Sequence, residues 1–136
     1  DGAIPSGNSV SALNLLQLGQ LTGNSAYQKQ AEKLLNSLAQ ALNYNSPFLL
    51  QAVEFLLAPR QELTLVSEQP VPLELVKAFL PNLALLVKKT GLEEIAPFTA
   101  EMSSQNGQTT YYLCQNQSCQ EPTNDWKKVK ESLDIN

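Results

Sequence analysis

The sequence contains no histidine, and it has only two cysteines among its 136 residues. Without histidine, the chain cannot form a Ser-His-Asp triad, a Cys-His pair or a histidine-ligated metal site from its own residues. Structural zinc sites typically have four ligands, so two thiolates would need a second chain to complete one. We therefore expect no cofactor, no metal site and no catalytic residue in this chain alone.

Long apolar runs and clusters of basic residues are scarce as well. The longest apolar segments, such as "LALLV", are far shorter than the roughly 20 residues that cross a bilayer. The formal net charge is −4, and "WKKVK" is too small a basic cluster to neutralise nucleic-acid phosphates. We expect neither a membrane nor a nucleic acid as partner. Because two cysteines are too few for a secreted disulfide scaffold, we expect a cytoplasmic location.

What is present is the composition of a globular protein, with 43% hydrophobic and 16% charged residues. The first predicted helix covers residues 8–22, and its apolar side chains point nearly all the way round the helix axis. Such a helix should be buried on most sides. Ser6 or Asn8 can cap its N-terminus, and Gly23 can end it in a left-handed conformation.

Two further helices are expected before residue 60. The segment 25–42 has one apolar face and begins with a capping box at Ser25. The segment 46–58 begins with Ser46 as cap and a proline at the first helical position. Three helices therefore occupy the first part of the chain, and they alternate between nearly full and one-sided burial.

The pattern changes after Pro59. Three short segments are typical of strands: "ELTLVS", "LALLVKK" and "TTYYLC". "LALLV", apolar on both faces, is expected to be the central strand. "PLELVKAFL" is helical, and a last amphipathic helix, capped by Asp125 or Asn124, should fold back over the sheet. The predicted fold is α+β and mainly helical, with a helical segment at 1–59 and a small, three-stranded α/β subdomain at 60–136.

Four polar residues at the start of the chain form the candidate ligand-binding site. A carboxylate with free amides at a helix N-terminus can line a polar pocket. The alternative, that the carboxylate only braces the turn, is favoured. Adjacent carboxylates such as Glu93 and Glu94 diverge on a helix and should be solvated. The candidate residues are Asp1, Ser6, Asn8 and Ser9.

The two cysteines, Cys114 and Cys119, are separated by four residues, whereas thioredoxin-like dithiol centres have two residues between their cysteines. This spacing favours a structural role over thiol exchange. We expect the two thiols to lie close enough to form a bridge on oxidation, at the end of the "TTYYLC" strand. In the cytosol they should be mostly reduced.

Two motifs near opposite ends of the chain resemble the C-terminal region of the YyaL or spermatogenesis-associated thioredoxin-like family. The first is "DGAIPSGNS" followed by a leucine-rich helix, and the second is "YYLCQNQSCQEP". In this sequence the motif positions are Asp1, Gly2, Ala3, Pro5, Ser6, Gly7, Asn8 and Ser9, then Tyr112, Cys114, Asn116, Cys119 and Pro122.

The resemblance implies a longer protein, in which a thioredoxin-like domain precedes an α/α toroid similar to six-hairpin glycosidases and epimerases. This chain would hold the last toroid helices and a small α/β tail, and its partners would be the other parts of that protein. One hypothesis is that it contributes the wall of a carbohydrate-like pocket without catalysing a reaction itself. The alternative is a structural or interaction module that supports the thioredoxin-like domain. An isolated chain with part of a ring should expose apolar surface and form homo-oligomers.

Overall fold

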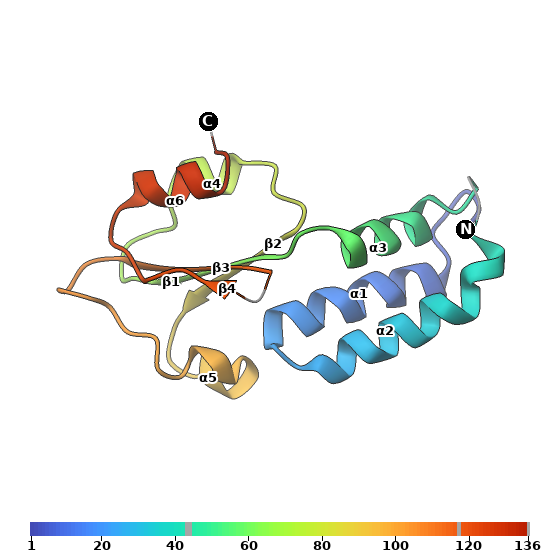
Figure 1. Ribbon diagram of the computed structural model, residues 1–136, viewed down its shortest axis with the longest axis horizontal. Coiled ribbons are helices and arrows are strands. Elements are labelled where there is room, and N and C mark those ends of the chain that lie inside the picture. The colour runs from blue at the N-terminus through green and yellow to red at the C-terminus, as the bar shows by residue number, and fades with distance from the viewer. Residues whose placement is uncertain (43–44, 117, 136) are drawn as a thin grey trace. The chain divides into compact units, whose positions relative to one another are not determined.

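The computed structural model describes residues 1–42, 45–116 and 118–135 (Figure 1). The chain divides into two compact units, Asp1–Ala58 and Pro59–Asn136. The described part of the first unit is helical, and the second unit combines helices with a sheet. The expected α+β class is confirmed. That the first unit is the end of an α/α toroid stays a prediction.

Helix α1 spans Gly7–Thr22 and has the expected ends. The Ser6 side chain accepts a hydrogen bond from the Ser9 amide, and Gly23 ends the helix at φ 69°. Glycine is favoured there because this left-handed backbone region is strained for residues with a Cβ. Of the two predicted caps, Ser6 is therefore the one used, and Asn8 lies inside the first turn.

Burial of α1 differs from the expectation. Its buried residues are Ser9, Ala12, Leu16 and Gln20, which follow one helical stripe, whereas Val10 and Leu18 are exposed. The prediction of burial on most sides is wrong within this chain. The reason is that α1 packs mainly against α2 and α3, and two neighbouring helices cannot cover the whole circumference of a third.

Helix α2 spans Ser25–Leu38, a short 3₁₀ helix covers Ala39–Ala41, and α3 spans Pro47–Leu57. The predicted capping box at Ser25 is wrong: Asn24 is the cap, and its side chain accepts from the Ala26 amide. Ser46 precedes α3 as predicted, but its side chain makes no hydrogen bond to the first amides of that helix. Buried leucines and alanines of α1, α2 and α3 form the core of this unit.

The second unit contains a mixed sheet with the strand order β2-β1-β3-β4. The strands are β1 (Gln61–Val66), β2 (Leu83–Lys88), β3 (Thr110–Gln115) and β4 (Ser118–Cys119). β1 pairs in parallel with β2 and antiparallel with β3, which pairs antiparallel with β4. Three strands were expected. The fourth arises because the chain turns back directly after β3 and adds a two-residue strand.

The prediction that "LALLV" forms the central strand is wrong, because β2 lies at the edge of the sheet and pairs only with β1. β1 is an inner strand, and its Leu63, Thr64 and Leu65 are all buried. Apolar residues on both faces of a strand show that both faces are covered by other elements. They do not fix the position of the strand within the sheet.

Helices α4 (Leu73–Lys77) and α6 (Trp126–Ser132) lie over one face of the sheet, and α5 (Leu92–Ile95) lies on the opposite side (Figure 1). A second 3₁₀ helix, Pro97–Thr99, follows α5. Asp125 caps α6, and the predicted folding of this helix over the sheet is confirmed. The core under α4 and α6 consists of Leu63, Leu65, Leu75, Tyr111, Leu113, Val129 and Leu133.

Candidate functional site

The Asp1 carboxylate accepts hydrogen bonds from four donors on two helices and the turn before them. Its Oδ1 accepts from the Ser6 amide at 2.8 Å and from the Ser9 hydroxyl at 2.6 Å. Its Oδ2 accepts from the amides of Phe48 and Leu49, both at 3.1 Å. These two amides are in the first turn of α3, where they have no partner within the helix. Asp1 therefore caps a helix that begins more than forty residues further along the chain.

The serines next to Asp1 belong to the same network. The Ser6 and Ser9 hydroxyls lie 2.8 Å apart, and Ser6 Oγ accepts from the Ser9 amide at 3.1 Å. Ser9 is 2% exposed, whereas Asn8 is on the surface. Of the four predicted ligand-binding residues, the structure thus brings together Asp1, Ser6 and Ser9, and it leaves Asn8 outside this network.

The hydrogen bonds of Asp1 can stabilise the helical unit without a ligand. A carboxylate offers about four lone-pair sites to hydrogen-bond donors. Donors of the chain itself match these sites in number, and the negative charge lies at the N-termini of α1 and α3, where it stabilises both helices. A ligand would have to displace one of these donors to bind Asp1. The geometry favours the bracing role, and ligand binding by these residues stays a prediction.

Cys114 and Cys119 form a disulfide that joins β3 to β4 close to the turn between them. The two residues are directly opposite each other in the strand register, and their Cα atoms are 3.9 Å apart. Cys119 is exposed and Cys114 is half-buried. The structure therefore shows the bridged form of the pair at the predicted end of the strand. That the thiols are mostly reduced in the cell stays a prediction.

A carboxylate that the sequence analysis did not select lies beside this disulfide. Glu62 of β1 is directly opposite Cys114 in the antiparallel β1–β3 register, so both side chains are on the same face. Burial raises the pKa of Glu62, and the positive charge of Arg60 partly offsets that rise. The only sequence signal was an acidic residue inside a predicted strand.

A hollow of about 520 Å³ lies at the carboxyl ends of the parallel strands β1 and β2. Lys88, in its lining, is already engaged: its Nζ donates to the carbonyls of Thr99, Ala100 and Met102 at 2.6, 2.9 and 2.6 Å. An ammonium can hydrogen-bond the last carbonyls of a helical turn. Lys88 thus holds the segment after α5 against the sheet.

Glu93, also in this lining, is not the fully solvated carboxylate that the sequence predicted. The residue is half-buried, and its Oε2 is buried without a hydrogen-bond partner. Hydrogen bonds from the backbone amides of Glu93 and Gly91 lower the pKa of its carboxyl. Glu94 is exposed, as expected.

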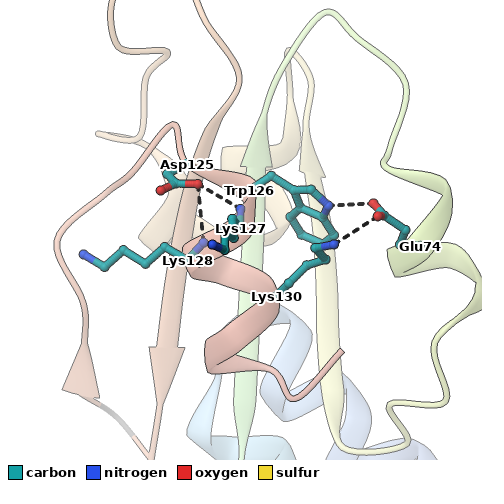
Figure 2. A network of polar contacts seen from close by, with 6 residues as sticks. All are labelled: Glu74, Asp125, Trp126, Lys127, Lys128 and Lys130. Carbon is teal, nitrogen blue, oxygen red and sulfur yellow. Dashed lines mark hydrogen bonds and ion pairs between the residues drawn. The ribbon is translucent and has the colours of Figure 1, made fainter. Parts of the chain in front are cut away.

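A polar network joins α4 to α6 above the sheet (Figure 2). Glu74 accepts from Trp126 Nε1 at 2.7 Å and from Lys130 Nζ at 3.1 Å. The hydrogen bond from Trp126, followed by that from Lys130, lowers the pKa of the Glu74 carboxyl. The Trp126 ring also packs on Tyr111, with the ring centroids 5.5 Å apart. These contacts fix the two helices relative to each other.

The described residues contain no group of three or more histidine, cysteine, aspartate or glutamate side chains placed to hold a metal ion. None of the helices in the described ranges combines the length and apolar character needed to cross a membrane.

Comparison with known proteins identifies relatives over nearly the whole chain. Spermatogenesis-associated protein 20 of Homo sapiens is 29% identical over 146 aligned positions, which cover 98% of this chain and 19% of the human protein. The chain is a homologue of spermatogenesis-associated protein 20. The proteins of that name in Rattus norvegicus and Mus musculus are 29% and 28% identical, again over 98% of this chain. The family resemblance predicted from the two motifs is confirmed.

The similarity to spermatogenesis-associated protein 20 includes both the helical unit and the sheet unit, because it covers 98% of the chain. The chain spans about a fifth of the length of these curated relatives. No protein-family model matches the sequence, and no solved structure matches the chain.

Proposed function

We propose that the helical unit is an interaction module that packs against other parts of a longer protein similar to spermatogenesis-associated protein 20. The supporting observation is the apolar surface of α1. Val10 and Leu18 are about two turns apart and therefore lie on the same side of the helix. They are 40% and 43% exposed, while Ala12 and Leu16 on the opposite side are buried. An exposed apolar stripe opposite a buried one is typical of a helix with a second partner.

Helix α3 supports the same proposal. Leu50 and Leu57, which are spaced by about two turns, are both exposed, and Leu57 is 77% exposed. α1 and α3 are neighbours in the helical unit, so both offer apolar side chains that this unit does not bury. The matched segment covers 19% of the human protein, so that protein is about five times as long as the segment. The remainder of a polypeptide of this length is the partner in this proposal.

The carbohydrate-like pocket has less support. That hypothesis needs Asp1 to offer its carboxylate to a ligand, and the carboxylate accepts four hydrogen bonds from within the chain. The module proposed here acts by packing, and it needs no reactive group. Its partner recognises apolar side chains on α1 and α3.

The test mixes this chain with the remainder of the longer polypeptide, expressed as a separate protein, and measures complex formation by size-exclusion chromatography with light scattering. We expect a stoichiometric complex at tens of micromolar. Leu18→Glu and Leu50→Glu should each abolish it. Leu73→Glu is the matched control, because Leu73 is an exposed leucine in the other unit. A complex that forms equally well with Leu18→Glu and Leu50→Glu would contradict the proposal, as would no complex at all.

A further inference from the structure

The Cys114–Cys119 disulfide is accessible to a reaction partner. Cys119 is exposed in β4, the two-residue strand at the edge of the sheet. A thiolate can therefore approach its sulfur from solvent without any movement of the core. Buried structural disulfides offer no such approach, and exposed ones are the more easily exchanged.

The hairpin does not depend on this bond for its conformation. The Gln120 amide donates to the Leu113 carbonyl at 2.9 Å across the β3–β4 pair. The Asn116 amide donates to the Arg60 carbonyl at 3.0 Å, and the Arg60 amide donates back to Asn116 Oδ1 at 3.0 Å. A disulfide that closes a short loop also restricts the unfolded chain least. Reduction should therefore leave the hairpin in place, ready to be oxidised again.

A carboxyl group lies opposite the cysteine whose sulfur would leave. Glu62 is directly opposite Cys114, on the same face of the β1–β3 pair. Side chains opposite each other in an antiparallel pair have Cβ atoms about 5 Å apart, within reach of a glutamate carboxyl. Because burial raises its pKa, this carboxyl keeps its proton to a higher pH than an exposed glutamate.

We propose that the Cys114–Cys119 disulfide is an exchange site for a dithiol, with Glu62 as the proton donor to the leaving sulfur. One thiolate of the dithiol attacks Cys119 Sγ and forms a mixed disulfide. The Cys114–Cys119 bond breaks, and its electron pair goes to Cys114 Sγ, which takes the proton from Glu62. The second thiolate of the dithiol then attacks the dithiol sulfur in the mixed disulfide and releases Cys119 as a thiolate, which takes its proton from water. The dithiol loses two electrons, and both cysteines become thiols.

The kinetic test uses the oxidised chain and dithiothreitol as the dithiol. Samples are quenched with an alkylating reagent, and mass spectrometry counts the labelled thiols over time. We expect Glu62→Gln to slow reduction, and its difference from the unmodified chain to grow to about tenfold as the pH falls from about 7 to about 5, because only the protonated carboxyl has a proton to give. Glu68→Gln is the matched control, since Glu68 is an exposed carboxylate of the same unit, and it should react like the unmodified chain. Equal rates for Glu62→Gln and the unmodified chain would overturn the role of Glu62.

The equilibrium test uses mixtures of reduced and oxidised glutathione. We expect the oxidised fraction to follow the ratio of the two forms reversibly, with an unchanged circular dichroism spectrum. A bond that stays oxidised in a large excess of reduced glutathione, or a sheet that unfolds on reduction, would overturn the exchange site and indicate a structural disulfide. Neither result affects the binding test above, because α1 and α3 belong to the other unit.

Discussion

A single carboxylate at the start of the chain joins two helix N-termini. Asp1 lies eight residues before Ser9 and 47 residues before Phe48, and it accepts hydrogen bonds from both. The sequence indicated the first contact, because Asp1 directly precedes a capped helix. It gave no signal for the second, since a contact over this separation depends on how α3 packs beside α1.

We expect Asp1→Ala to lower the free energy of unfolding of the helical unit by about 2 kcal/mol, the upper range for loss of an N-cap. The first amides of α3 lose their acceptor in this variant, and so does the Ser6 amide before α1. Urea unfolding followed by far-ultraviolet circular dichroism measures the effect. Asn8→Ala, a change at an exposed neighbour, should have little effect. Equal stability of Asp1→Ala and Asn8→Ala would contradict the bracing role and leave the pocket hypothesis as the better account.

The ionisation of Glu74 should make the free energy of unfolding depend on pH. Its pKa is lowered from the usual 4.5 in the folded chain by hydrogen bonds from Trp126 and Lys130, so folding favours the ionised carboxylate. This contribution is fully present above pH 4.5 and is lost as the pH falls through the folded-state pKa. Between pH 6 and pH 3, taken as about the range in which exposed carboxylates titrate, the unmodified chain should lose more stability than Glu74→Gln.

The measurement is the free energy of unfolding of both proteins across this pH range, with Glu131→Gln on α6, the helix that Glu74 contacts, as a control. A constant difference between the unmodified chain and Glu74→Gln at every pH would show that the carboxylate makes no ionisation-dependent contribution.

At the scale of helices and strands, local signals predicted the elements and missed their partners. Ser6 and Asp125 are caps as expected, because a cap depends only on neighbouring residues. The cap of α2 is Asn24 and not Ser25. Both side chains can cap a helix, and the backbone conformation decides which of the two residues lies outside it. The order of the strands was not predictable from "LALLV", because strand order depends on contacts between distant segments.

The segment after α5 gives an element-scale prediction. Lys88 Nζ donates to three carbonyls there, and Lys88→Met removes these bonds without removing the aliphatic stem. We expect a loss of about 2 kcal/mol in unfolding free energy, the range for hydrogen bonds to a charged group. Amide hydrogen exchange between Pro97 and Met102 should become faster. Lys89→Met, a change at the more exposed neighbour, is the control. Unchanged exchange in Lys88→Met would refute the anchoring role.

At the scale of the whole molecule, the exposed apolar side chains of α1 and α3 are a feature that packing within the helical unit does not explain. The sequence predicted bare apolar surface, and it predicted homo-oligomers of the isolated chain as the result. Hiding about 400 Å² of such surface favours association by about 10 kcal/mol before the costs of ordering are subtracted. Without other parts of a longer protein, a second copy is the available partner.

The structure shows which residue of α3 is suitable for a charged substitution in the association test. Leu18→Glu and Phe55→Glu would each place a charge on one of the two helices, α1 and α3, that carry the exposed apolar side chains. Phe55 is half-buried against the helical core, so a charge there would destabilise the unit itself. Leu50 is exposed on the same helix and is the better choice.

Sedimentation velocity of the unmodified chain at increasing micromolar concentrations tests the central claim most directly, namely that α1 and α3 carry an interaction surface. The account predicts dimers or larger species whose fraction grows with concentration, and folded monomers for Leu18→Glu and Leu50→Glu. A monomer at every concentration, or association that persists unchanged in both variants, would contradict it.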